Sequence, residues 1–128
     1  MTAFSIARLP RIEFGAGAIQ KLPDIIASYG AHVLLVTGAH SFINTPHWQF
    51  LIDQFEHRSV TWRHCTVAEE PSPALIDELV KAHAGDDFTA VAGIGGGSAL
   101  DAAKAVAGLL RVQRSVMDYL EGVGPELP

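Results

Sequence analysis

Three adjacent glycines, Gly95, Gly96 and Gly97, precede Ser98 where an apolar run gives way to an amphipathic segment. At the carboxyl end of a parallel strand, backbone amides and the start of the next helix attract anions through hydrogen bonds and the helix dipole. A β-carbon would block a ligand there, whereas glycine leaves the amides open and permits positive φ. Ser98 adds a hydroxyl that can bind a ligand or cap the helix. These residues predict a phosphate-binding loop.

Two charged residues follow the glycines in the first turns of the expected helix. Asp101 and Lys104 are three positions apart, so they can pair with each other or with the loop, and Lys104 can lend charge to a phosphate. Ser98 stands where the dinucleotide pattern G-x-G-x-x-G requires its third glycine, and the chain has no Gly-Lys-Ser/Thr of a Walker loop. The alternative is a tight strand-to-helix turn whose small residues serve packing alone.

The other residues capable of chemistry form no recognisable site. The 6 histidines include no H-E-x-x-H or comparable ligand pair, so they are interpreted as singly exposed side chains. Cys65 has no Cys-x-x-Cys partner and lies in an alternating segment, which is typical of a buried, inert thiol. The sequence therefore predicts no catalytic and no metal-binding residue in this chain.

Strands and helices alternate along the chain, and this alternation positions the glycine loop. Three segments have the apolar, β-branched composition of strands, namely residues 33–37, 59–67 and 88–94. Helical periodicity follows each of them, and Thr45 and Ser72 each precede a proline in the position of a helix cap. A strand followed by a helix three times over predicts an α/β fold: a three-layer, Rossmann-like parallel sheet with helices on both faces.

Both ends of the chain depart from this alternation. The stretches "FSIAR" and "RIEF" around Pro10 predict a short N-terminal strand pair, and the next segment predicts a helix that restarts at Pro23. Residues 114–128 contain one possible helical turn and then glycines and prolines, as at the start of a linker. With 128 residues, of which 48% are hydrophobic, we expect one domain spanning residues 1–128.

Composition excludes several classes of partner. The net charge is -5 and the 9 lysines and arginines are scattered, so nucleic acid and anionic membranes are not expected. No apolar run approaches the roughly 20 residues of a membrane-spanning helix. A single cysteine and the lack of a secretory signal favour a reducing, cytoplasmic setting.

Five stretches, in order along nearly the whole chain, resemble the N-terminal nucleotide-binding domain of the iron-containing (group III) alcohol dehydrogenases. They are "PRIEFGAGAIQKL", "VLLVTGAHS", "EEPSPALIDELV", "GIGGGSALDAAKAVAGLL" and "DYLEG". The fourth is highly specific for a superfamily that also includes glycerol dehydrogenase, maleylacetate reductase and dehydroquinate synthase. The resemblance implies an enzyme that moves a hydride between an alcohol or aldehyde and a nicotinamide cofactor, NAD(P), which this domain mainly holds.

The resemblance also implies roles for particular residues. Residues 95–98 would cradle the pyrophosphate, and Asp101 and Lys104 would support the loop. Glu70, before a proline, matches a position near the adenosine ribose.

A second group of residues concerns the choice between NAD and NADP. Thr37 and Gly38 match the place where many members carry an aspartate that binds the ribose hydroxyls, and that acid is absent here. The stretch "TGAHS" resembles the small-residue version of NADP-using members. Ser41 could donate to a 2′-phosphate, and His40 could pair with it when protonated. The sequence therefore favours NADP.

The same resemblance implies a second, helical C-terminal domain that carries the metal ligands, an aspartate and several histidines, for iron or zinc. The chain ends at Pro128, before such a domain, so we expect an inactive fragment whose intact form is a homodimer. Three alternatives stay open: another member of the superfamily, such as glycerol dehydrogenase or maleylacetate reductase; a stand-alone nucleotide-binding module without catalysis; and a structural domain of flavodoxin-like form in which the glycines only pack.

Overall fold

The structure is a computed structural model, and it describes residues 11–13, 18–40, 42–68, 70–113 and 118–122. Its strands are β1 (Arg11–Glu13), β2 (His32–Gly38), β3 (Thr61–Val67), β4 (Ala90–Ile94) and β5 (Asp118–Gly122). Its helices are α1 (Leu22–Tyr29), α2 (Pro46–His57), α3 (Pro73–His83) and α4 (Gly97–Gln113), with a 3₁₀ turn, η1 (Ala18–Lys21), before α1. Strand and helix alternate from β2 onwards, as the periodicity predicts.

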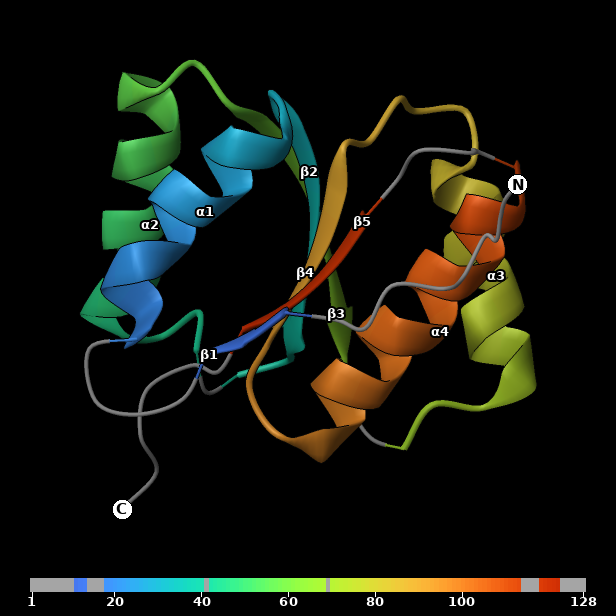
Figure 1. Cartoon of the computed structure of the whole chain (residues 1–128). Coiled ribbons are helices and arrows are strands. Elements are labelled where there is room, and N and C mark those ends of the chain that lie inside the picture. The colour runs from blue at the N-terminus through green and yellow to red at the C-terminus, as the bar shows by residue number, and fades with distance from the viewer. Residues whose placement is uncertain (1–10, 14–17, 41, 69, 114–117, 123–128) are drawn as a thin grey trace.

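The strands form one five-stranded sheet in the order β1-β5-β4-β2-β3, and every neighbouring pair is parallel. Helices α1 and α2 cover one face and α3 and α4 cover the other (Figure 1). The α/β fold class and the three-layer arrangement are therefore confirmed.

The core has two halves because successive strand residues point to opposite faces of the sheet. Val33 and Leu35 of β2 belong to the cluster under α1 and α2, whereas Leu34 and Val36 belong to the cluster under α3 and α4. All four side chains are completely buried. This double burial explains why β2 reads as a continuous apolar run.

The predicted helix starts are in place, but the two caps differ. Ser72 precedes α3 and its Oγ accepts a hydrogen bond from the backbone N–H of Leu75 at 3.1 Å, which confirms the expected cap. Thr45 occupies the cap position of α2, yet its hydroxyl donates to the carbonyl of Phe42 at 2.7 Å. That hydroxyl therefore ties the preceding turn and does not cap α2.

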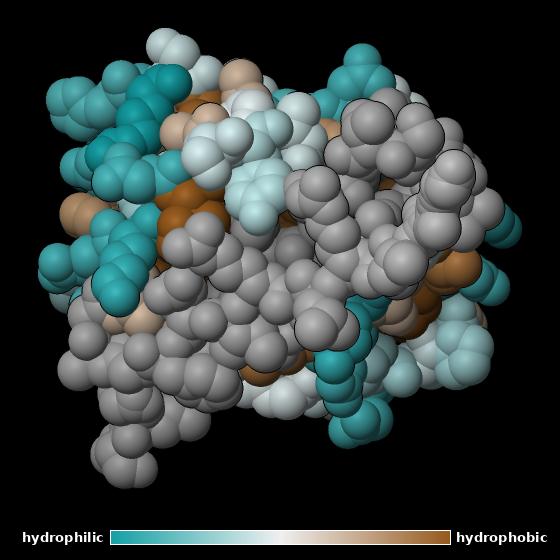
Figure 2. Space-filling view, viewed as in Figure 1, coloured by the Kyte–Doolittle hydropathy of each residue, from teal (hydrophilic) through white to brown (hydrophobic). Residues whose placement is uncertain are grey.

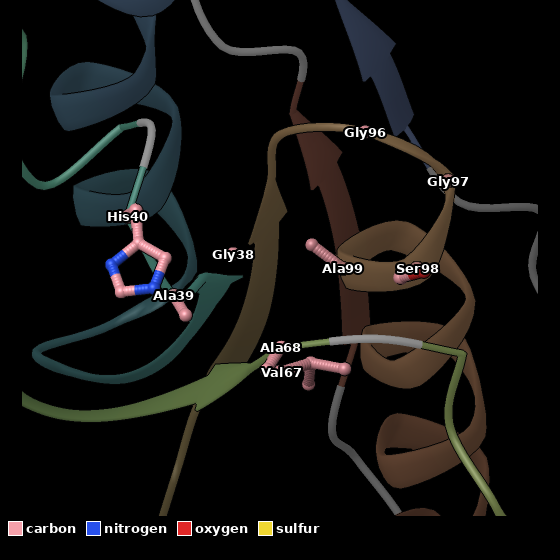
Figure 3. A pocket seen from close by; sticks show the side chains of 9 residues that line it. All are labelled: Gly38, Ala39, His40, Val67, Ala68, Gly96, Gly97, Ser98 and Ala99. Carbon is pink, nitrogen blue, oxygen red and sulfur yellow. The ribbon is translucent and has the colours of Figure 1, made fainter.

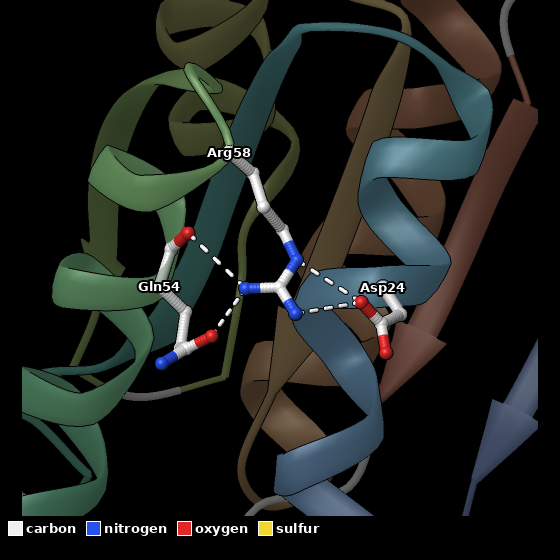
Figure 4. Close-up of polar contacts among 3 residues, drawn as sticks. All are labelled: Asp24, Gln54 and Arg58. Atoms are coloured by element: carbon white, nitrogen blue, oxygen red, sulfur yellow. Dashed lines mark hydrogen bonds and ion pairs between the residues drawn. The ribbon is translucent and has the colours of Figure 1, made fainter.

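An ion pair joins α1 to the end of α2 (Figure 4). Nε and Nη2 of Arg58 donate to Oδ1 of Asp24 at 3.0 and 2.7 Å, and Nη1 donates to the side chain and the backbone carbonyl of Gln54. The side chain of Asp24 is 77% exposed, so solvent screens the pair and its contribution to stability stays below about 1 kcal/mol.

The structure corrects one expectation about the ends of the chain. Strand β1 pairs in parallel with β5, whereas "FSIAR" lies outside the described residues, so the N-terminal strand pair stays a prediction. Residues 118–122, expected within a linker after a helical turn, form β5 between β1 and β4. Because sheet context outweighs intrinsic preference in a five-residue segment, composition did not reveal this strand. The extent of the domain remains a prediction.

Within the described residues, no helix is long and apolar enough to cross a membrane.

Gly108 lies in the middle of α4, exposed, with open space where a β-carbon would project. Glycine inside a helix costs about 0.5–1 kcal/mol relative to alanine, because its unfolded backbone has more freedom to lose. We expect Gly108→Ala to raise the free energy of unfolding by about that amount. Urea unfolding of both chains measures the difference, and a destabilised variant would contradict the open environment of this position.

Candidate functional site

The sheet order places a crevice at the carboxyl ends of β2 and β4. After β2 the chain continues through α2 to β3 on one side, and after β4 it continues through α4 to β5 on the other. In open parallel sheets, ligands bind where neighbouring strands diverge in this way, because the loops that follow them separate.

A pocket of about 280 Å³ lies at this position (Figure 3). The lining residues come from the ends of β2 and β3 and from the start of α4: Gly38, Ala39, His40, Val67, Ala68, Gly96, Gly97, Ser98 and Ala99. None of these side chains is a carboxylate, and His40 is the one titratable side chain among them. The pocket is therefore small-residue lined and free of fixed negative charge, which suits an anion.

The glycines around the loop have different structural roles. A β-carbon at Gly96 or Gly97 would meet no atom within 4 Å, so these positions border open space. A β-carbon at Gly93 would lie 2.7 Å from the β-carbon of Ala103, so that glycine lets α4 pack closely on β4. Gly95 has φ +132°. Positive φ is thus required at Gly95, and close packing is required at Gly93.

Helix α4 presents its N-terminus to the pocket. The helix begins at Gly97, and the N–H of Leu100 bonds to the carbonyl of Gly96 at 3.1 Å. The first N–H groups of a helix have no partner within it, so they are available to a ligand. Ser98 is half-buried and lines the pocket, but it lies one residue inside the helix. Its predicted role as the cap is therefore wrong, while its hydroxyl remains at the site.

The structure does not bring all predicted residues together. Gly38, Gly96, Gly97 and Ser98 line the pocket, and Gly95 forms the turn beside it.

Other predicted residues lie apart from the lining. Asp101, Lys104 and Glu70 are exposed and do not line the pocket. Thr37 is completely buried behind Gly38, where its hydroxyl contacts the ring of His64. Ser41 lies outside the described residues.

Four lining residues were missed from the sequence, namely Ala39, Val67, Ala68 and Ala99. Val67 is the last residue of β3 and Ala68 follows it, and together they form one wall of the pocket. Their only signal is positional, because β3 lies beside β2 and the carboxyl ends of parallel strands share one edge of the sheet.

The described residues contain no group of three or more His, Cys, Asp or Glu side chains that could hold a metal ion. Burial raises the pKa of the Cys65 thiol to about 11, so this cysteine is uncharged at neutral pH and poorly nucleophilic.

Comparisons with known proteins agree on one family. The family model for iron-containing alcohol dehydrogenase matches residues 10–128. The long-chain primary alcohol dehydrogenase AdhA of Thermoanaerobacter ethanolicus is 36% identical over 102 residues, which cover 76% of this chain and 26% of that protein. A probable NADH-dependent butanol dehydrogenase of Bacillus subtilis is 28% identical, with 84% of this chain and 28% of that protein covered.

Solved structures give the same result. An iron-containing alcohol dehydrogenase from Thermotoga maritima matches with a TM-score of 0.73 and 28% identity, covering 93% of this chain and 36% of that one. The chain thus spans about a quarter of the length of the two curated relatives. On the family model, the relatives and the fold together, this chain belongs to the iron-containing alcohol dehydrogenase family.

Proposed function

We propose that the pocket binds the diphosphate of a nicotinamide dinucleotide. One observation carries the proposal: β-carbons at Gly96 and Gly97 would enter open space directly beside the first N–H groups of α4. Glycine is needed at such positions when another molecule fills the space, because nothing in the protein does so. The N-terminal end of the helix dipole favours the negative charge of the diphosphate.

For the whole protein, we propose hydride transfer between an alcohol or aldehyde and the nicotinamide. When bound, the nicotinamide would accept the hydride from an alcohol or donate it to an aldehyde. Two curated relatives are named as dehydrogenases of a long-chain primary alcohol and of butanol, which supports an alcohol as substrate. The lining residues of this chain bind and orient the cofactor, since most of them are glycine, alanine or valine, which transfer no protons. The described residues offer no ligand set for the metal that the family's name implies, so no metal-dependent step is assigned to them.

Fluorescence titration of the 128-residue chain with NADH and NADPH tests the binding proposal. We expect saturable binding that ADP displaces, because ADP carries the same diphosphate. A folded chain that binds neither dinucleotide would reject the proposal.

For the choice of cofactor, we propose NADPH over NADH. Ala39 and His40 follow β2 and line the pocket (Figure 3). Neither is a carboxylate that would repel a 2′-phosphate. A ring N–H of His40 can donate a hydrogen bond to a phosphate oxygen. We expect NADPH to bind about three- to tenfold more tightly than NADH, the value of one hydrogen bond at partial exposure.

Paired titrations with both cofactors measure this preference, and His40→Ala is the matched variant. The variant should lose the preference for NADPH and keep its affinity for NADH. Tighter binding of NADH by the parent chain would contradict the proposal.

A further inference from the structure

Thr37 and His64 form a hydrogen-bonded connection behind the pocket wall. Oγ1 of Thr37 lies 2.8 Å from Nε2 of His64 on β3 and 2.9 Å from the carbonyl oxygen of Gly38. Thr37 has no exposed surface, so water does not compete for its hydroxyl. The connection therefore runs from the edge strand β3 to the neighbouring strand β2, whose last residue, Gly38, lines the pocket.

Counting protons fixes the direction of these bonds. A threonine hydroxyl has one hydrogen to donate and lone pairs with which to accept. Because the hydroxyl of Thr37 donates to the carbonyl of Gly38, it must accept from His64. Burial lowers the pKa of His64, so its ring is neutral near pH 7 and has a single N–H. That N–H must then be on Nε2.

Aromatic neighbours hold the ring of His64 in place. Trp48 of α2 packs against it with ring centroids 4.6 Å apart and planes inclined by 39°. Trp48 also meets Trp62 edge to face at 5.7 Å, and Trp62 is two residues from His64 on the same face of β3. Packing against Trp48 and the hydrogen bond to Thr37 thus both fix the orientation of the Nε2–H group.

Gly38 is the last residue of β2 and pairs with Val67 of β3. A β-carbon at Gly38 would meet nothing within 4 Å, so no side chain packs over its α-carbon, and the hydrogen bond to its carbonyl adds to the restraint from the sheet. Its carbonyl belongs to the same planar peptide unit as the N–H of Ala39, and the described residues contain no cis peptide bond. Fixing the carbonyl therefore also fixes the direction of the Ala39 N–H at the pocket wall.

We propose that His64 is a positioning residue for the nucleotide pocket: through the hydroxyl of Thr37 it orients the peptide unit between Gly38 and Ala39. The inference rests on the proposed function of the pocket. His64 does not line the pocket, so its effect on the cofactor is exerted entirely through Thr37.

Three variants test this role. His64→Leu and Thr37→Val each remove one member of the connection and keep a similar shape. His64→Gln keeps an amide N–H that can reach the hydroxyl. We expect each of the first two to weaken the binding of NADH and NADPH about three- to tenfold, the worth of one lost hydrogen bond, and His64→Gln to retain most of the affinity. The double variant should bind no more weakly than either single variant, because both break the same connection.

Dissociation constants and melting temperatures are measured together. A purely structural role would lower the melting temperature of His64→Leu and leave the dissociation constants unchanged. That result would overturn this inference and leave the proposed function of the pocket unaffected. A parent chain that binds neither dinucleotide overturns the proposed function and this inference with it.

The tautomer of His64 provides a second test, which is made on the parent chain itself. Long-range ¹H–¹⁵N correlation spectra of the parent chain should show the proton on Nε2 near pH 7, with the signal assigned by its loss in His64→Gln. A neutral ring protonated on Nδ1 would contradict the direction of the connection.

Discussion

Replacing Gly96 by valine is expected to abolish tight dinucleotide binding while the chain stays folded, and Gly97→Val should do the same. The added side chain meets no protein atom within 4 Å of its β-carbon, so the fold has room for it. Both glycines line the pocket, so we expect the added side chain to separate the phosphate from the N–H groups of α4. A hydrogen bond to a charged group is worth about 1.5–3 kcal/mol, so losing one or more weakens binding about 10- to 100-fold.

Fluorescence titration with NADPH measures the affinity of each variant, and thermal unfolding measures whether the variant stays folded. Gly108→Ala is the matched control, because Gly108 also has open space around it and lies on α4 away from the pocket. The control should bind as the parent chain does. Unchanged affinity in a folded Gly96→Val would show that the glycines do not face the cofactor, and unfolding of that variant would favour the interpretation that they only pack.

The sequence predicted the part of the fold that has strong periodicity. The apolar run of β2 and the periodic segments α2 and α3 are long enough for burial and spacing to identify them. Strand β5 has five residues and strand β1 has three, and their pairing with each other depends on contacts between the two ends of the chain. Such distant pairing leaves no local pattern in the sequence.

The candidate site could be predicted only where the residue type itself is informative. The glycines and Ser98 mark the loop, because few other residues allow an anion to approach a helix N-terminus. Ala39 and Ala68 carry no such chemical signature, and only the order of the strands brings them to the pocket. The sequence also could not distinguish Gly93 from Gly96, since both stand in one glycine-rich stretch and their difference lies in what surrounds them.

That difference predicts the opposite outcome at Gly93. A β-carbon there would lie 2.7 Å from the β-carbon of Ala103 and 3.4 Å from Cδ2 of Leu100. The β-carbon of Ala103 is attached directly to the backbone and cannot rotate away, so Gly93→Ala must push α4 from β4. Overpacking of a buried contact costs about 1–3 kcal/mol, which lowers the melting temperature by several degrees in a domain of this size.

A second substitution separates this clash from other causes of instability. Ala103→Gly removes the opposing β-carbon and, being a glycine inside a helix, costs about 1 kcal/mol by itself. In the double variant the clash is gone, so its destabilisation should be smaller than the sum of the two single effects by about 1–2 kcal/mol, as for residues in contact. Additive losses in urea unfolding would contradict close packing of α4 on β4 at this position. Because Gly93 does not line the pocket, folded Gly93→Ala should retain more of its affinity for NADPH than Gly96→Val does, which assigns packing to one glycine and ligand binding to the other.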